Sequence, residues 1–131
     1  MYLSKTHIHL DVDDACQSAT FYEALLGAPP ARQSSVAAVF DFDSPPLVLT
    51  VEERGHGKHA RRAARAARQG SARFSLVVTQ PQHVGIAAIA LRRAGVQLRL
   101  EDSAIEAEDP DGNAWQVRFV ESAPGRFVET I

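Results

Sequence analysis

Residues 6–27 read THIHLDVDDACQSATFYEALLG, and this stretch decides the fold expected of the chain. Polar and apolar residues alternate over residues 6–12, which is the pattern of a strand with one buried face. Asp13 and Asp14 then offer an N-cap for a helix that ends at Gly27, a residue type that readily adopts the left-handed conformation of helix ends. The stretch therefore predicts a strand followed at once by a helix.

The residues after this helix predict two more strands. Residues 36–42 and 47–51 are rich in apolar and β-branched side chains, and the turn-forming residues 43–46 separate them. There is room for one further short strand. The first half of the chain, about residues 5–53, therefore reads strand, helix, strand, strand.

The second half, about residues 72–120, repeats this order. It predicts a helix that begins near Pro81 and ends at Gly95. Its expected strands cover residues 72–78, 96–101, 104–108 and 114–120, the last of them after a turn at residues 109–113.

A weak internal repeat relates the two halves. When their first strands are superposed, Leu10 aligns with Leu76 and Val12 with Val78. Each half alone would leave one sheet face uncovered, so the halves are expected to pack together. The predicted fold class is α+β, with two βαβββ modules forming a curved sheet around a central cavity and the helices outside. The whole chain, residues 1–131, is expected to form this single domain.

Composition excludes several classes of protein. Hydrophobic residues make up 45% and charged residues 23%, as in ordinary globular proteins, so a disordered or fibrous chain is not expected. No apolar run approaches the roughly 20 residues that cross a bilayer, and the first residues lack the layout of a signal peptide. We therefore expect a cytoplasmic protein with no membrane partner.

Cys16 is the only cysteine of the chain. An intrachain disulfide and a thiolate zinc site are therefore excluded. Because it lies in the first predicted helix, Cys16 is expected to be a small packing residue rather than a nucleophile.

The positive charge is concentrated in residues 54–70, which hold six Lys and Arg residues and no acid, although the whole chain has a net charge of -2. Nucleic-acid binding is not expected, because this stretch has no aromatic residue for base stacking and the rest of the chain is acidic. Residues 54–71 are predicted to be a basic, solvated linker, and residues 121–131 a tail.

Three motifs carry a resemblance to a known superfamily: residues 7–12, then Phe21-Tyr22 with residues 25–27, and residues 109–115, which read DPDGNAW. With this spacing the chain resembles the vicinal oxygen chelate superfamily, which includes glyoxalase I, extradiol dioxygenases, and the fosfomycin and bleomycin resistance proteins. Residues 40–49 further resemble the branch of cadmium-induced proteins and organoarsenical carbon-arsenic lyases. Those lyases carry a cysteine pair between the final strands, where this chain has none at residues 100–106.

The resemblance implies a metal site, built in metal-binding relatives from two histidines and a glutamate on the first strand of each half and on the last strand. His7 fits this set, but Arg73 and Gln116 stand at the other two positions. A guanidinium has no lone pair to donate and remains charged, and a neutral amide coordinates weakly. We therefore expect no metal and no other cofactor; the alternative is a divalent metal such as Zn, Fe or Mn, held by His7 and Gln116.

Alternation along the strands predicts which side chains face the cavity. The expected ligand-binding residues are polar or charged: His7, His9, Arg73, Gln116 and Arg118. Trp115, Val117 and Phe119 should lie on the opposite, buried face. Two arginines suit an anionic small molecule, because each offers paired donors to carboxylate or phosphonate oxygens. Alternatively, His7 is a structural histidine, and Arg73 pairs with an acid such as Asp11 or Glu52.

Two classes of function remain open. The first is a small-molecule-binding protein without chemistry. The second is an enzyme, either a metal-dependent lyase, glyoxalase or dioxygenase with altered ligands, or a metal-free isomerase or hydrolase that uses His7 or His9 as general base. No catalytic residue is assigned. A homodimer is expected, and the halves pair either within one chain or between two.

Overall fold

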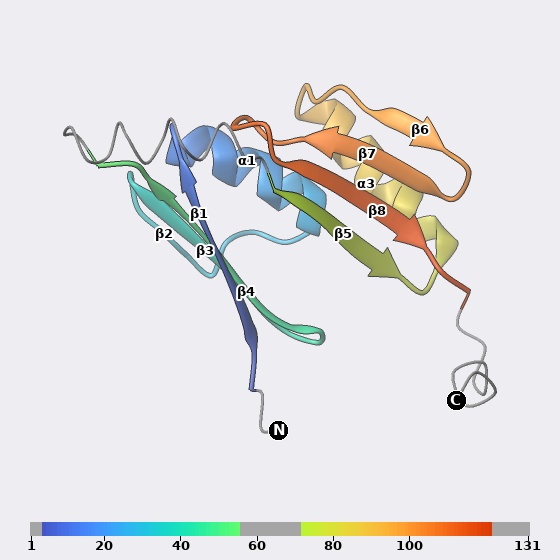
Figure 1. Cartoon of the computed structure of the whole chain (residues 1–131), viewed down its shortest axis with the longest axis horizontal. Helices are drawn as coiled ribbons and strands as arrows, with labels where there is room; N and C mark the ends of the chain where they lie inside the picture. The colour runs from blue at the N-terminus through green and yellow to red at the C-terminus, as the bar shows by residue number, and fades with distance from the viewer. Residues whose placement is uncertain (1–3, 56–71, 122–131) are drawn as a thin grey trace.

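The computed structural model describes residues 4–55 and 72–121 (Figure 1). In chain order its elements are β1 (Thr6–Val12), α1 (Ala15–Leu26), β2 (Arg32–Gln33), β3 (Ala37–Asp43), β4 (Pro46–Glu53), β5 (Arg73–Val78), α3 (Pro81–Arg93), β6 (Arg99–Glu101), β7 (Ala104–Glu108) and β8 (Ala114–Phe119). Most of the predicted basic linker and nearly all of the predicted tail lie outside the described residues. No helix within the described ranges is long and apolar enough to span a membrane.

The two halves have the same topology. Their four-stranded sheets have the orders β1-β4-β3-β2 and β5-β8-β7-β6. In each sheet the first strand runs parallel to the last, and the other pairs are antiparallel. The predicted α+β fold of two βαβββ modules is confirmed.

The two sheets remain separate from each other. In the described residues no strand of one sheet pairs with a strand of the other. The modules therefore form two open sheets instead of the one curved sheet that the sequence predicted. Figure 1 shows the sheets diverging below α1, with α3 behind the second sheet. Contact between α1 and α3 joins the halves in place of strand pairing.

Local sequence signals explain where the helices begin and end. The Asp14 carboxylate accepts a hydrogen bond from the Gln17 backbone N–H at 3.0 Å, which caps α1 as predicted. Pro81 occupies the first turn of α3, where its missing N–H costs nothing. Gly27 and Gly95 follow the two helices with φ of 74° and 83°. The repeat therefore extends to the helix ends.

One hydrophobic core serves both halves. Trp115 of β8 stacks on Phe74 of β5 with ring centroids 4.4 Å apart, and meets the edge of Tyr22 of α1 at 5.4 Å. Buried residues of both halves complete the cluster, among them Val12, Phe40, Leu49, Val51, Leu91 and Ile105. The halves are thus joined by aromatic packing.

Two local expectations were wrong. The strand predicted at residues 96–101 begins only at Arg99, because residues 94–98 cross from α3 to the sheet. Cys16 is exposed and not a packing residue. The buried face of α1 runs through Ala15, Ala19 and Tyr22, and the position after Ala15 is turned about 100° away from it.

Candidate functional site

Each sheet has one face covered by helices and one open face. On β8, Trp115 and Val117 are buried, whereas Gln116 is half-buried and Arg118 is exposed. This confirms the predicted alternation. His7 and His9 lie on the open face of the first sheet, and Arg73, Gln116 and Arg118 lie on the open face of the second.

Several polar side chains on the open face of the first sheet have partners on the same face. His7 Nε2 lies 3.0 Å from Thr50 Oγ1, and His9 Nε2 lies 3.6 Å from Asp11 Oδ1. Lys5 Nζ lies 2.5 Å from Asp41 Oδ1 and 3.0 Å from an oxygen of the Asp43 carboxylate. The hydrogen bonds to these two carboxylates raise the pKa of Lys5.

The open face of the second sheet is arranged in cross-strand rows. One row places Arg73 of β5 opposite Ala114 of β8, which in turn lies opposite Glu108 of β7. The next row contains Ser75, Gln116, Glu106 and Arg99.

Only the second of these rows is linked by its side chains. Ser75 Oγ donates to Gln116 Oε1 at 3.3 Å, and Arg99 Nη1 donates to Glu106 Oε2 at 3.4 Å. Neither Arg73 nor Arg118 has an acidic partner among residues 4–55 and 72–121. The alternative pairing of Arg73 with Asp11 or Glu52 is not found in those ranges.

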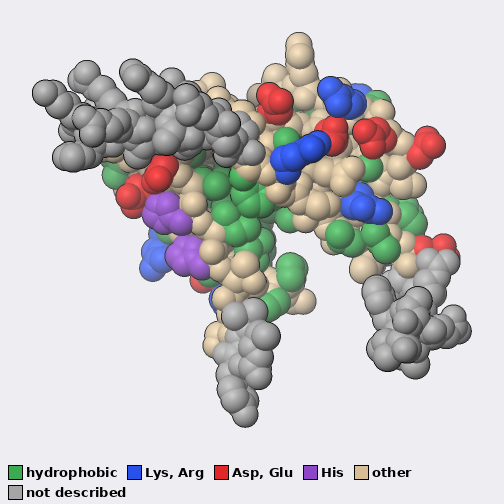
Figure 2. All heavy atoms as spheres, viewed as in Figure 1, with side chains coloured by type: hydrophobic (Ala, Val, Ile, Leu, Met, Phe, Trp, Pro, Cys, Tyr) green, Lys and Arg blue, Asp and Glu red, His purple; other side chains and the backbone are tan. Residues whose placement is uncertain are grey.

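The structure does not bring all five predicted site residues together. His7 and His9 belong to one sheet, whereas Arg73, Gln116 and Arg118 belong to the other, and no described hydrogen bond or ion pair joins the two groups. Figure 2 shows histidine side chains (purple) on the side of the molecule that carries the first sheet. The five residues form two groups because the two sheets that carry them are not joined at their edges in the described part of the chain.

The residues at the metal position that the sequence resemblance implies do not fit a metal ion. Arg73 offers no lone pair, and the amide oxygen of Gln116 already accepts a hydrogen bond from Ser75. Across the described part of the chain, no three His, Cys, Asp or Glu side chains come close enough together to hold an ion. Among residues 4–55 and 72–121, His7 therefore lacks the neighbours that a three-ligand site requires.

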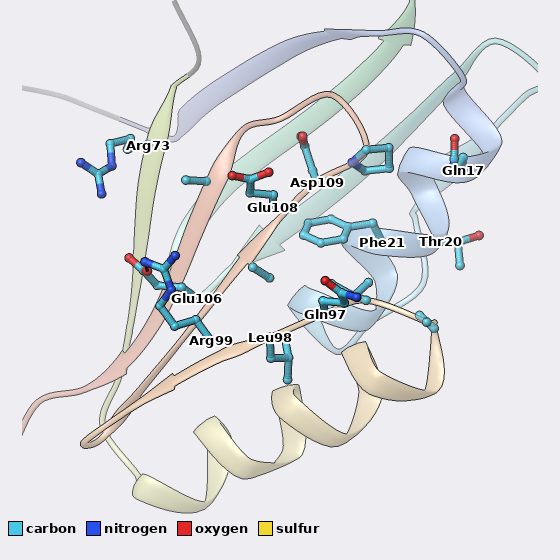
Figure 3. A pocket seen from close by; sticks show the side chains of 16 residues that line it. Gln17, Thr20, Phe21, Arg73, Gln97, Leu98, Arg99, Glu106, Glu108 and Asp109 are labelled. Carbon is cyan, nitrogen blue, oxygen red and sulfur yellow. Dashed lines mark hydrogen bonds and ion pairs between the residues drawn. The ribbon is translucent and has the colours of Figure 1, made fainter.

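A pocket of about 820 Å³ lies beside the second sheet (Figure 3). Gln17, Thr20 and Phe21 of α1 form one wall, and the segment 94–99 forms another. Further lining comes from the second sheet and the turn after it: Arg73, Glu106, Ala107, Glu108, Asp109, Pro110 and Ala114. Sequence reasoning missed this pocket, because it combines a helix of the first half with strands of the second.

A buried polar link beside this pocket joins the halves. Tyr22 Oη donates to Asp109 Oδ2, and Trp115 Nε1 donates to Tyr22 Oη at 3.0 Å. Burial, together with the nearby Asp109 carboxylate, raises the pKa of Tyr22 far above its ordinary value of 10.0. The Asp109 carboxylate also accepts from the backbone N–H groups of Asp111 and Asn113 at 2.9 and 2.8 Å. This turn therefore has a structural role.

Arg54 adds a second link between the halves. Its Nη1 lies 2.6 Å from Asp13 Oδ1 and 3.0 Å from Asp111 Oδ1, and its side chain is only 10% exposed. The prediction of a solvated linker is therefore wrong for Arg54. Its only sequence signal was its place directly after the last strand of the first half.

Comparison with known proteins agrees with this geometry. Residues 6–117 match the model of the Glyoxalase/Bleomycin resistance protein/Dioxygenase superfamily. The chain belongs to this superfamily. No curated protein matches the chain in sequence.

Solved structures of other proteins share the fold. A glyoxylase/bleomycin resistance protein/dioxygenase domain from Frankia sp. EAN1pec is 16% identical, with a TM-score of 0.67 over 91% of this chain and 98% of that one. A glyoxalase-related enzyme from Fulvimarina pelagi is 20% identical, with a TM-score of 0.64 over 91% and 89%. A protein from the mobile metagenome of V. Pseudocholerae is 22% identical, with a TM-score of 0.65 over 93% and 98%. At these identities the likeness is one of fold alone.

Proposed function

We propose that this chain is a small-molecule-binding member of the superfamily that holds an anionic ligand on the open face of its second sheet, without a metal ion. The observation that carries this proposal is the position of Arg73. It lines the pocket of about 820 Å³ and has no acidic partner in the described part of the chain. A guanidinium in this situation has its donors available for a carboxylate or a phosphonate.

Gln116 supports the same proposal. Its amide oxygen accepts a hydrogen bond from Ser75, and its amide nitrogen carries two further N–H donors. Arg118 lies farther along β8, about 13 Å from Arg73 in the strand direction at roughly 3.3 Å per residue. We therefore assign the anionic group to Arg73 and Gln116, and a more distant part of the ligand to Arg118. His7 and His9 would take part only if a second copy placed its first sheet over this face.

The alternative of a metal-dependent lyase, glyoxalase or dioxygenase has less support. It would need ligands that Arg73 and Gln116 do not offer. We propose kinship with the cadmium-induced and organoarsenical lyase branch only from the resemblance of residues 40–49, and we propose no lyase chemistry, because the chain has no cysteine pair.

The test is a titration of chelator-treated protein with sodium butyrate, followed by NMR of the backbone and arginine side chains. We expect the parent to bind and Arg73→Ala to bind about tenfold more weakly or worse, because a hydrogen bond to a charged group contributes roughly 1.5–3 kcal/mol. Arg93→Ala is the matched control, since Arg93 is an exposed arginine at the end of α3.

Two results would contradict the proposal. The first is butyrate binding that Arg73→Ala leaves unchanged. The second is stoichiometric, tight binding of Zn²⁺ by the parent in calorimetry, which would favour the metal-dependent enzyme instead.

A further inference from the structure

Arg73 and Glu108 face each other across a small residue. Both are paired in register with Ala114, one from β5 and the other from β7. Neighbouring strands lie about 4.8 Å apart, so the two Cα atoms are separated by roughly 10 Å. Only the methyl group of Ala114 stands between them. This row therefore has a positive side chain and a negative side chain on either side of the small side chain of Ala114.

Glu108 is the carboxylate in this pocket that has no partner in the described part of the chain. Among the described residues, Glu106 is paired with Arg99, and Asp109 is buried and bonded to Tyr22 and its own turn. Glu108 is exposed, and within residues 4–55 and 72–121 it forms no ion pair and no side-chain hydrogen bond. Its charge is available to a ligand, as the charge of Arg73 is.

Figure 3 shows how the two side chains lie in the pocket. Glu108 stands near its centre, and Arg73 stands on the edge strand β5 with its guanidinium turned outward. An exposed arginine changes rotamer within nanoseconds, so this guanidinium can turn over Ala114. Gln17, Thr20 and Gln97 add neutral hydrogen-bonding groups around the same space.

We infer that the ligand of this pocket is a small zwitterion, whose carboxylate binds Arg73 and whose ammonium group binds Glu108 across Ala114. The inference rests on the proposed function and narrows its ligand class. A simple anion bound to Arg73 would lie close to the negative charge of Glu108, which opposes its binding. A zwitterion satisfies both unpaired side chains at once.

The experiment compares three probes with the same four-carbon skeleton: 4-aminobutyrate, butyrate and butylamine. We expect the parent to bind 4-aminobutyrate about tenfold more tightly than butyrate, as measured by NMR titration. Glu108→Gln keeps the size of the side chain but removes its charge. It should abolish that preference by weakening 4-aminobutyrate about tenfold while leaving butyrate equal or tighter.

Glu101→Gln is the matched control, because Glu101 is an exposed glutamate of the same sheet outside this pocket, and it should behave as the parent. Equal binding of butyrate and 4-aminobutyrate, or no effect of Glu108→Gln, would overturn the zwitterion while the anion-binding function stands. Failure of all three probes to bind would overturn both.

Discussion

The two sheets share a topology but differ in what their open faces offer. On the first sheet, Lys5 is held between Asp41 and Asp43, and His7 is bonded to Thr50. On the second sheet, Arg73 and Glu108 have no partner in the described residues and line a pocket. The difference teaches that repeating a backbone does not repeat its chemistry. Packing constrains the buried face of each module, whereas side chains on the open face are exchanged at little cost in stability.

The two helices differ in the same sense. Six residues of α1 are buried, and its Tyr22 reaches the second half, whereas α3 buries only Ala87 and Leu91 and leaves Ile86 and Ile89 exposed. The first helix is therefore packed more deeply than the second. The second half supplies most of the candidate ligand surface.

The largest expected effect is on the mass of the assembly, which depends on whether a second copy of the chain covers the edge strands of the two sheets. The strands β1 and β5 are edge strands of seven and six residues, while the opposite edges β2 and β6 have only two and three. Long unpaired edges are usually covered, so we propose a homodimer that covers them. Light scattering at micromolar concentration should give twice the 14.2 kDa of one chain. A mass of one chain would refute the dimer and leave His7 apart from Arg73.

The next effect comes from breaking the link between the halves. Arg54→Met removes the cation that joins Asp13 to Asp111 and leaves the Asp111 side chain, only 3% exposed, without this partner. Loss of one member of a buried ion pair costs about 3–5 kcal/mol. Urea unfolding should show this loss, and Arg93→Met, at an exposed position of α3, should show almost none. A loss below about 1 kcal/mol would mean that the pair behaves as a surface ion pair.

A smaller effect comes from the buried tyrosine. Tyr22→Phe removes the donor to Asp109 and leaves Trp115 Nε1 without its acceptor, so we expect a loss of about 1–3 kcal/mol at neutral pH.

The pH dependence of Tyr22→Phe adds a second observable. The folded protein keeps the Tyr22 proton, because its pKa is raised, whereas the unfolded chain releases it near pH 10. The free energy of unfolding should therefore fall above about pH 10, by up to roughly 1.4 kcal/mol per pH unit from this group, and fall less steeply in Tyr22→Phe. Urea unfolding between pH 8 and pH 11 measures how steeply the free energy of unfolding falls with pH in the parent and in Tyr22→Phe. Equal slopes would show that Tyr22 ionises in the folded state as it does in the unfolded chain.

The sequence by itself determined the order of the elements, their caps and the buried face of each strand. These depend on neighbours a few residues apart: Asp14 caps the helix that follows it, and Trp115 and Gln116 point to opposite faces because strands alternate. The same alternation placed Arg73 and Gln116 on an open face. The likeness of the motifs to a superfamily was likewise readable without coordinates.

Only the tertiary structure decided how the faces are arranged relative to one another. The separation of His7 from Arg73 and the pairing of Arg54 with Asp111 depend on contacts between residues far apart in the chain. So does the pocket between α1 and β7, in which Glu108 lies opposite Arg73 across Ala114. The physical reason is that local patterns specify which face of each element is apolar, whereas the packing of those apolar faces against one another sets which polar side chains become neighbours.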